Sequence, residues 1–154
     1  DFLKDVEAVN REVNFSDLGV QLTRSSRALK IWMAFKEQGA EKVGRLIAKD
    51  IGLARYMAEK VAAHPQLELF APVDLNIVCF RHKAASEDAA KELNTEIMLR
   101  LQERGLAVPS DTTVQGKHGL RCAFNNHRTQ RADIDGFLED VIKIAQEIIL
   151  ETAG

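Results

Sequence analysis

One arginine in this chain is placed by its neighbours where it could bind an anionic ligand. The run LRCAFN at 120–125 alternates between apolar and other residues. Because successive side chains of a strand point to opposite faces, Leu120, Cys122 and Phe124 would share one face and Arg121 would lie on the other. A planar guanidinium suits a carboxylate, to which it can donate two parallel hydrogen bonds. The sequence therefore predicts an anion-binding Arg121 on an uncovered sheet face, with a surface or interdomain ion pair as the alternative.

The side chains that could bind a metal or transfer protons are scattered along the chain. Cys79 and Cys122 lie in strand-like apolar runs, and we interpret them as small buried hydrophobic residues of a protein in a reducing compartment. None of the four histidines has a second histidine or a cysteine at metal-ligand spacing; they are His64, His82, His118 and His127. We predict surface or hydrogen-bonding roles for them and no metal site.

Two further arginines, Arg24 and Arg27, lie one turn apart at the start of a helical pattern. Their stems could pack against a neighbouring lobe while their charged heads pair with acids there. Alternatively, they could lie at the edge of a substrate entrance. Both interpretations remain open at the level of sequence.

The longest helical pattern, at residues 23–64, must position much of the chain. Its apolar residues recur at helical spacing; they include Val43, Leu46, Ile47, Ala54, Met57, Ala58 and Val61. Ser25 or Ser26 can cap its start, Gly39 marks a kink or break, and Pro65 ends it. At ~1.5 Å per residue an unbroken helix would be roughly 55–60 Å long, which suits a seam between two lobes.

After residue 65 the pattern changes to strands and two more helices. We expect strands at 67–70, 75–81, 106–108, 112–115 and 120–125, a turn at 116–119, a helix from the cap Ser86 to near Gly105, and a helix from about Thr129. The order is a long helix followed by β-β-α-β-β-α. This order predicts an α+β fold whose helices cover one face of a mainly antiparallel sheet.

Composition excludes several classes of function. The 154 residues include 21 Lys and Arg against 23 Asp and Glu, a net charge of −2, without the basic face of a nucleic-acid or acidic-membrane binder. No apolar run is long enough to span a membrane, and the opening DFLKD does not resemble a signal peptide. We therefore expect a cytoplasmic protein that binds neither nucleic acid nor membrane.

Three stretches, in this order and spacing, resemble a known enzyme family. They are RSSRALKIW at 24–32 with Gly39 shortly after, LNIVCFR at 75–81 and LRCAFNNHRT at 120–129. They are similar to segments downstream of the cofactor lysine in pyridoxal-phosphate-dependent amino acid decarboxylases, the group that acts on aromatic amino acids, glutamate and diaminobutyrate. The resemblance covers nearly all of this chain but only the C-terminal portion of such an enzyme.

The resemblance implies a division of labour between this chain and an upstream large domain. Residues 1–22 would be an extended arm left from the mobile loop of that domain, 23–64 connecting helices and 65–154 the small domain. In the homodimeric enzyme, pyridoxal 5′-phosphate (PLP) would act as an electron sink while an L-amino acid loses CO2, and Arg121 would hold a substrate carboxylate. The attachment lysine, ring acid and phosphate cradle would lie upstream, so we assign no cofactor contact here and expect the fragment alone to be inactive.

The first residues depart from the usual decarboxylase. Asp1-Phe-Leu-Lys4 resembles the mobile loop, in which most members carry a tyrosine that returns a proton after CO2 leaves. Phe2 has no proton to donate. A phenylalanine there is a feature of related aldehyde-forming enzymes, in which the intermediate reacts with oxygen. The other interpretation is that Phe2 is an apolar residue that anchors the arm.

Two non-enzymatic hypotheses compete with this one. The chain could be an independent α+β module that binds a ligand or partner on its exposed sheet face, or a non-catalytic chain that pairs with a catalytic one. The unpartnered apolar arm argues against an independent module. The amino acid substrate stays open among the aromatic amino acids, glutamate and diaminobutyrate.

Overall fold

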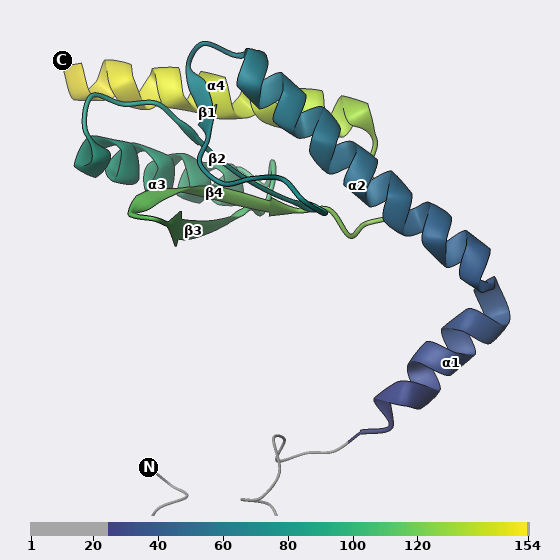
Figure 1. Cartoon of the computed structure of the whole chain (residues 1–154). Coiled ribbons are helices and arrows are strands. Elements are labelled where there is room, and N and C mark those ends of the chain that lie inside the picture. The colour runs from purple at the N-terminus through teal and green to yellow at the C-terminus, as the bar shows by residue number, and fades with distance from the viewer. Residues whose placement is uncertain (1–24, 154) are drawn as a thin grey trace, which may run out of the picture. The chain divides into compact units, whose positions relative to one another are not determined.

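A computed structural model describes residues 25–153 of the chain (Figure 1). In chain order the elements are α1 (Arg27–Gln38), α2 (Ala40–Ala63), β1 (Leu67–Leu69), β2 (Ile77–His82), α3 (Glu87–Glu103), β3 (Ser110–Val114), β4 (Lys117–Ala123) and α4 (Arg131–Ala153). The predicted α+β class and the order of elements are confirmed. The chain divides into two compact units, one ending at Ala40 and the other beginning at Glu41. The arm predicted at 1–22 lies outside the described residues, and the predicted domain boundaries stay predictions.

Gly39 separates the first two helices, as its position predicted. Its φ of 75° lies in the left-handed region that glycine adopts without strain, and its N–H donates to the carbonyl of Phe35 at 2.9 Å. α2 ends at Ala63, so the predicted stop before Pro65 is confirmed. The predicted hydroxyl cap is wrong for Ser26, which occupies the cap position of α1 without a side-chain hydrogen bond.

The four strands lie in the order β1-β2-β4-β3, and every neighbouring pair is antiparallel. The predicted hairpin of the first two strands is confirmed, with Leu67 opposite His82. β3 and β4 join through Gln115 and Gly116, whose φ angles of 51° and 79° suit a two-residue hairpin turn. The turn predicted at 116–119 is therefore wrong in position, because residues 117–119 already belong to β4.

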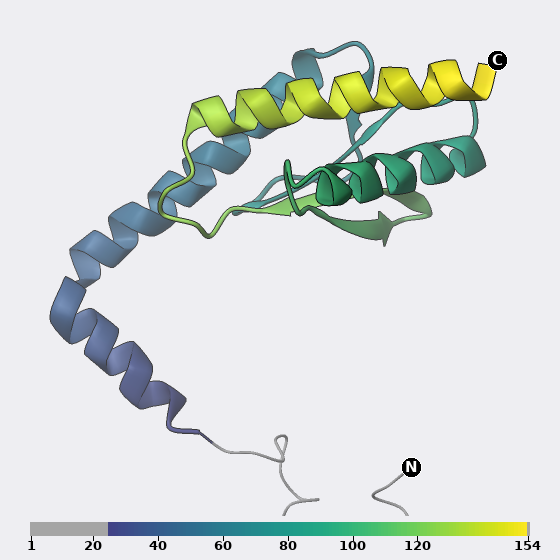
Figure 2. The ribbon, with the colours of Figure 1, turned by 180° about the vertical axis from the view of Figure 1, so that it is seen from behind.

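Helices α2, α3 and α4 cover one face of this sheet, as predicted (Figures 1 and 2). From the strands, Val78, Phe80 and Leu120 contribute fully buried side chains to the core. Phe80 also meets Phe137 of α4 edge to face, with ring centroids 6.0 Å apart. The helices add further buried residues: Leu53, Ala54, Met57, Val61, Leu93, Ile97, Leu101, Ile134, Leu138, Val141, Ile144 and Ala145.

The ends of α3 follow from local chemistry. The Ser86 hydroxyl accepts the N–H of Ala89 at 3.2 Å, which confirms the predicted cap. After the helix, Gly105 has a φ of 67°, and the Leu106 N–H donates to the carbonyl of Leu101 at 3.0 Å. This is the Schellman arrangement that closes helix ends. The strand predicted at 106–108 is wrong for this reason, since its first residues complete the end of α3.

α4 begins two residues later than the predicted start at Thr129, and the carboxylate of Asp133 accepts the N–H of Gln130 at 2.8 Å. The apolar spacing of this helix predicts a buried face from Ile134 to Ile149. Ile134, Val141 and Ala145 are buried, but Ile149 is 46% exposed where the last turns extend beyond the core, so the prediction fails there. None of the helices between residues 25 and 153 combines the length and apolar character that a membrane-spanning segment requires.

Candidate functional site

Arg121 lies in β4 on the sheet face that the helices leave open. Its directly opposite neighbours are Cys79 of β2 and Ser110 of β3. Opposite residues of antiparallel strands share a face, whereas Leu120 and Cys122 point into the helix-covered side. The face that alternation predicted for Arg121 is thus the one on which the structure places it.

The residues around Arg121 on this face are all small. Gly119 and Ala123 flank it along β4, and Cys79 and Ser110 flank it across the sheet. A Cβ at Gly119 would lie 2.7 Å from the ring of Phe70, so this buried phenylalanine stands directly over the glycine. The long side chain of Arg121 is therefore surrounded on this face by small residues, with the ring of Phe70 over the neighbouring Gly119.

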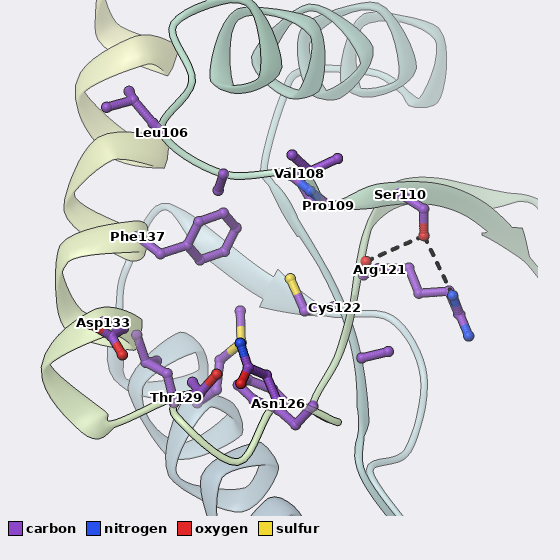
Figure 3. A pocket seen from close by; sticks show the side chains of 15 residues that line it. Leu106, Val108, Pro109, Ser110, Arg121, Cys122, Asn126, Thr129, Asp133 and Phe137 are labelled. Carbon is purple, nitrogen blue, oxygen red and sulfur yellow. Dashed lines mark hydrogen bonds between the residues drawn. The ribbon is translucent and has the colours of Figure 1, made fainter.

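Arg121 makes only weak polar contacts. Its Nη1 donates to Ser110 Oγ at 3.4 Å, and that hydroxyl lies 3.4 Å from the Arg121 carbonyl, to which it can donate (Figure 3). Among residues 25–153, no carboxylate lies within ion-pair distance of this guanidinium. Its donors are therefore available to an anion from outside the described chain.

Arg81 occupies the same face and is fully engaged. Its Nε donates to Glu68 at 2.7 Å, and Nη1 and Nη2 donate to the two carboxylate oxygens of Glu87 at 2.5 and 2.8 Å. The pKa of Arg81 is raised, chiefly by the hydrogen bonds to Glu87. The same contact lowers the pKa of Glu87. Arg81 has no free donor fork for a ligand, and we assign it a structural role.

Arg81 was not singled out from the sequence, and the strands predicted at 67–70 and 75–81 do not place it opposite an acid. In the observed pairing of β1 with β2, Glu68 lies opposite Arg81, which is the cross-strand position for an ion pair. Glu87 joins from the first turn of α3, a contact that depends on how the helix packs on the sheet.

A cavity of about 690 Å³ opens beside the end of β4 (Figure 3). This volume is typical of small-molecule sites, roughly 300–1,000 Å³. Polar and apolar groups contribute to its walls in similar measure; the lining includes Met57, Leu106, Val108, Cys122, Phe124, Asn126, Thr129, Asp133, Ile134 and Phe137. Arg121 and Ser110 form its edge, but the guanidinium of Arg121 is directed away from the cavity (Figure 3). Arg121 thus borders the cavity, but its guanidinium does not point into it.

The two cysteines are free, and neither is suited to act as a nucleophile. Burial raises the pKa of the Cys79 thiol, against a lowering effect of the Arg121 charge. Burial raises the pKa of Cys122 to about 12. Both would be thiols at neutral pH. Cys79 is buried and Cys122 half-buried, in line with their interpretation as small hydrophobic residues.

The histidines mostly make local hydrogen bonds. The ring of His118 lies between the hydroxyls of Thr113 at 3.0 Å and Thr95 at 3.2 Å. His64 accepts the N–H of Gln66 at 3.3 Å through Nδ1. Over the part of the chain that the structure describes, no three histidine, cysteine or acidic side chains come together as a metal site.

The structure describes two of the four predicted site residues. Arg121 belongs to the sheet unit, and Arg27 is the exposed first residue of α1 in the other unit. Phe2 and Arg24 lie outside the described residues. The roles of these residues stay predictions.

Comparison with known proteins assigns the chain to a family. The family model for the pyridoxal-dependent decarboxylase conserved domain matches residues 2–83. The chain therefore belongs to the pyridoxal-dependent decarboxylase family, and the resemblance drawn from its sequence is confirmed.

Individual relatives agree with this family. The aromatic-L-amino-acid decarboxylase of Bacillus atrophaeus is 30% identical over 152 residues, which cover 96% of this chain and 32% of the relative. The phenylacetaldehyde synthase of Arabidopsis thaliana is 30% identical over 157 residues, which cover 100% of this chain and 30% of the relative. A crystal structure of Oryza sativa TDC with PLP and tryptamine matches with a TM-score of 0.75 and 28% identity, covering 94% of this chain and 32% of that one. The chain spans about a third of the length of these relatives.

The family is pyridoxal-dependent, which implies a cofactor that the residues near β4 would have to fit if it were bound there. PLP needs a lysine for covalent attachment, an acid at its ring nitrogen and donors around its phosphate. The cavity beside β4 offers Asp133 but no lysine in its lining. The residues of this cavity do not fit the cofactor, and we assign them no step that involves it.

Proposed function

We propose that this chain forms the C-terminal part of a PLP-dependent amino acid decarboxylase that releases CO2 from an L-amino acid. Membership of the pyridoxal-dependent decarboxylase family supports this proposal. So does the coverage of the relatives, since the chain corresponds to about a third of each. The upstream large domain would carry the cofactor and its lysine, and the fragment alone would be inactive.

Exposed apolar surface on α1 supports a partner domain. No residue of this helix is buried. Five of its large apolar side chains are 45–59% exposed: Leu29, Ile31, Trp32, Met33 and Phe35. Apolar surface of this extent normally meets another part of a protein. We infer that the large domain or a second subunit covers it, as expected for connecting helices in a homodimer.

The observation that carries a role in catalysis is the free guanidinium of Arg121. It projects from the open face, is surrounded there by small residues and lacks a carboxylate partner among residues 25–153. A substrate carboxylate would accept two parallel hydrogen bonds from it. Arg121 would thereby orient the amino acid toward the large domain and close the small domain over it. A role for Arg24 and Arg27 at the edge of a substrate entrance stays a prediction.

The test uses the full-length polypeptide that contains this chain. Replacing Arg121→Met removes a charge-assisted contact, whose loss costs about 1.5–3 kcal/mol. We expect kcat/KM for CO2 release to fall roughly 10- to 100-fold as a result. Arg128→Met is a matched control, because it removes the same charge from the turn between β4 and α4, where only the backbone of Arg128 makes a hydrogen bond.

Two outcomes would count against the proposal in different ways. Unchanged kcat/KM in Arg121→Met would remove the arginine from the site and leave the decarboxylase assignment standing. Absence of CO2 release from any L-amino acid in the full-length protein would refute the assignment itself.

An aldehyde-forming activity is a second candidate, favoured by Phe2. Two relatives are named as aldehyde synthases, the phenylacetaldehyde synthase of Arabidopsis thaliana and the 4-hydroxyphenylacetaldehyde synthase of Rhodiola rosea. Without a proton donor at residue 2, the amino acid would react with O2 and water to give CO2, aldehyde, ammonia and hydrogen peroxide. We expect hydrogen peroxide and ammonia in equal amounts, and Phe2→Tyr should shift the product toward the amine. Amine alone from the unmodified enzyme would reject this candidate.

A further inference from the structure

His82, the last residue of β2, is held in the core by a side-chain clamp. The residue is 4% exposed. Its backbone N–H donates to Asn94 Oδ1 at 2.8 Å, and its carbonyl accepts from Asn94 Nδ2 at 2.9 Å. Asn94 is also buried and donates to the carbonyl of Ala90 one turn earlier in α3. The end of β2 is therefore tied to α3 through one amide.

The ring of His82 is satisfied on one side only. Nδ1 lies 2.8 Å from the carbonyl of Lys83, and a carbonyl can only accept, so Nδ1 carries the proton. Nε2 is buried and has no hydrogen-bond partner. As a bare lone pair it is tolerable, but a second proton there would create a charged, buried N–H with no acceptor among the described residues. Burial, with a smaller contribution from His64, accordingly lowers the pKa of His82.

The turn between α2 and β1 is bonded to the same end of β2. The backbone N–H of Lys83 donates to the carbonyl of Gln66, and its Nζ donates to the carbonyl of Pro65, both at 2.8 Å. His64 in that turn accepts the N–H of Gln66 through Nδ1, a contact that requires this nitrogen to be unprotonated. Two histidines thus lie where β2 joins its neighbours.

The charged groups around His82 do not offer it a counter-ion. The α2–β1 turn contributes His64, the loop after β2 contributes Lys83, and α3 contributes the neutral Asn94. The cavity that borders His64 and Leu67, the residue opposite His82, is lined by further charges: Lys60, Asp135, Glu139 and Lys143. Asp135 is paired with Lys60 at 3.0 Å. Over residues 25–153 no carboxylate forms an ion pair with His82.

We propose that His82 is an acid-sensitive lock of this domain. When its ring takes up a second proton, the clamp between β2 and α3 opens and the α2–β1 turn is released with it. The device follows from the clamp, the unpartnered Nε2 and the shared position of two histidines at one end of the sheet. It is independent of the proposed enzymatic function.

The direction of the pH effect is determined by the neutral folded form. A histidine whose folded pKa lies below its unfolded value contributes stability in full above about pH 6.5. That contribution is lost as the pH falls from 6.5 toward the folded pKa. The unfolding constant should therefore rise up to about tenfold per pH unit in this window and then level off.

The experiment is chemical denaturation of the 154-residue chain between pH 8 and pH 5. We expect the unfolding constant of the wild type to rise below pH 6.5 and that of His82→Phe to rise several-fold less. His127→Phe is the control, since His127 is exposed and should leave the wild-type rise intact. An equal rise in His82→Phe and the wild type would overturn the lock.

A second measurement covers the case in which His82→Phe does not fold. Ring titration of His82 in the wild type by NMR should give a midpoint below the ordinary histidine value of about 6.5, together with loss of protection of the His82 backbone amide at the same pH. A His82 midpoint at or above about 6.5 would overturn the proposal.

Discussion

Arg81 and Arg121 share one sheet face and have opposite surroundings. Arg81 is 5% exposed and donates three hydrogen bonds to two glutamates. Arg121, one strand away, contacts only the hydroxyl of Ser110, at 3.4 Å. The comparison teaches that residue type and face do not determine the role of an arginine here. The nearby carboxylates do, because they either occupy the guanidinium donors or leave them free.

The two arginines should therefore separate stability from function. Removing Arg81 deletes a buried side chain that donates to two partly exposed glutamates, and losing a hydrogen bond to a charged group costs about 1.5–3 kcal/mol. We expect Arg81→Met to lower the free energy of unfolding by about that amount, measured by denaturant titration. Arg121→Met should change it by at most about 0.5 kcal/mol, as surface substitutions do. Similar losses in both variants would break the comparison.

A smaller effect on the free energy of unfolding should follow from adding a methyl group at Gly119, which lies on the same sheet face as the two arginines. A Cβ at Gly119 would lie 2.7 Å from the Phe70 ring, from the Cβ of Arg81 and from the carbonyl of Phe80. We expect Gly119→Ala to lower the free energy of unfolding by about 1–3 kcal/mol through overpacking.

The matched control for that change is Gly136→Ala. Nothing lies within 4 Å of a Cβ at this α4 position, so the exchange should instead stabilise the helix by up to about 1 kcal/mol. Unfolding curves of the two variants compare them directly. A Gly119→Ala variant more stable than the wild type would show that the space beside Phe70 accommodates a methyl group.

The smallest expected effect is the acid response of the Arg81 pairs. The Arg81 guanidinium lowers the pKa of Glu87, so this contact stabilises the fold above the ordinary glutamate pKa of about 4.3. Its contribution is lost as the pH falls further, through the lowered folded pKa. Between pH 4.5 and 3, wild-type stability should fall more steeply than that of Glu87→Gln. Parallel curves of stability against pH would indicate that the Arg81–Glu87 contact does not contribute to stability. This pH window lies below the one assigned to His82.

Much of the fold was accessible from local patterns. The Ser86 cap, the break at Gly39 and the stop before Pro65 were predicted because each depends on neighbouring residues. The errors also have local causes. GKHG contains two glycines and suggests a later turn, whereas the backbone turns at Gln115 and Gly116. The strand predicted at 106–108 competed with the hydrogen bonds that close α3, and those bonds prevailed.

The order of residues in 120–125 determined by itself which way Arg121 faces, because the period of two in a strand is a property of the backbone. Only the tertiary structure decided that this guanidinium is free and that of Arg81 is not. Glu68 is 13 residues from Arg81 in sequence and Glu87 is six, and they meet it only after strand pairing and the packing of α3. No such partner reaches Arg121 within the described residues, since its cross-strand neighbours are a cysteine and a serine. A single sequence does not show which distant carboxylates will converge on a cation, and here that convergence separates a structural arginine from a candidate ligand-binding one.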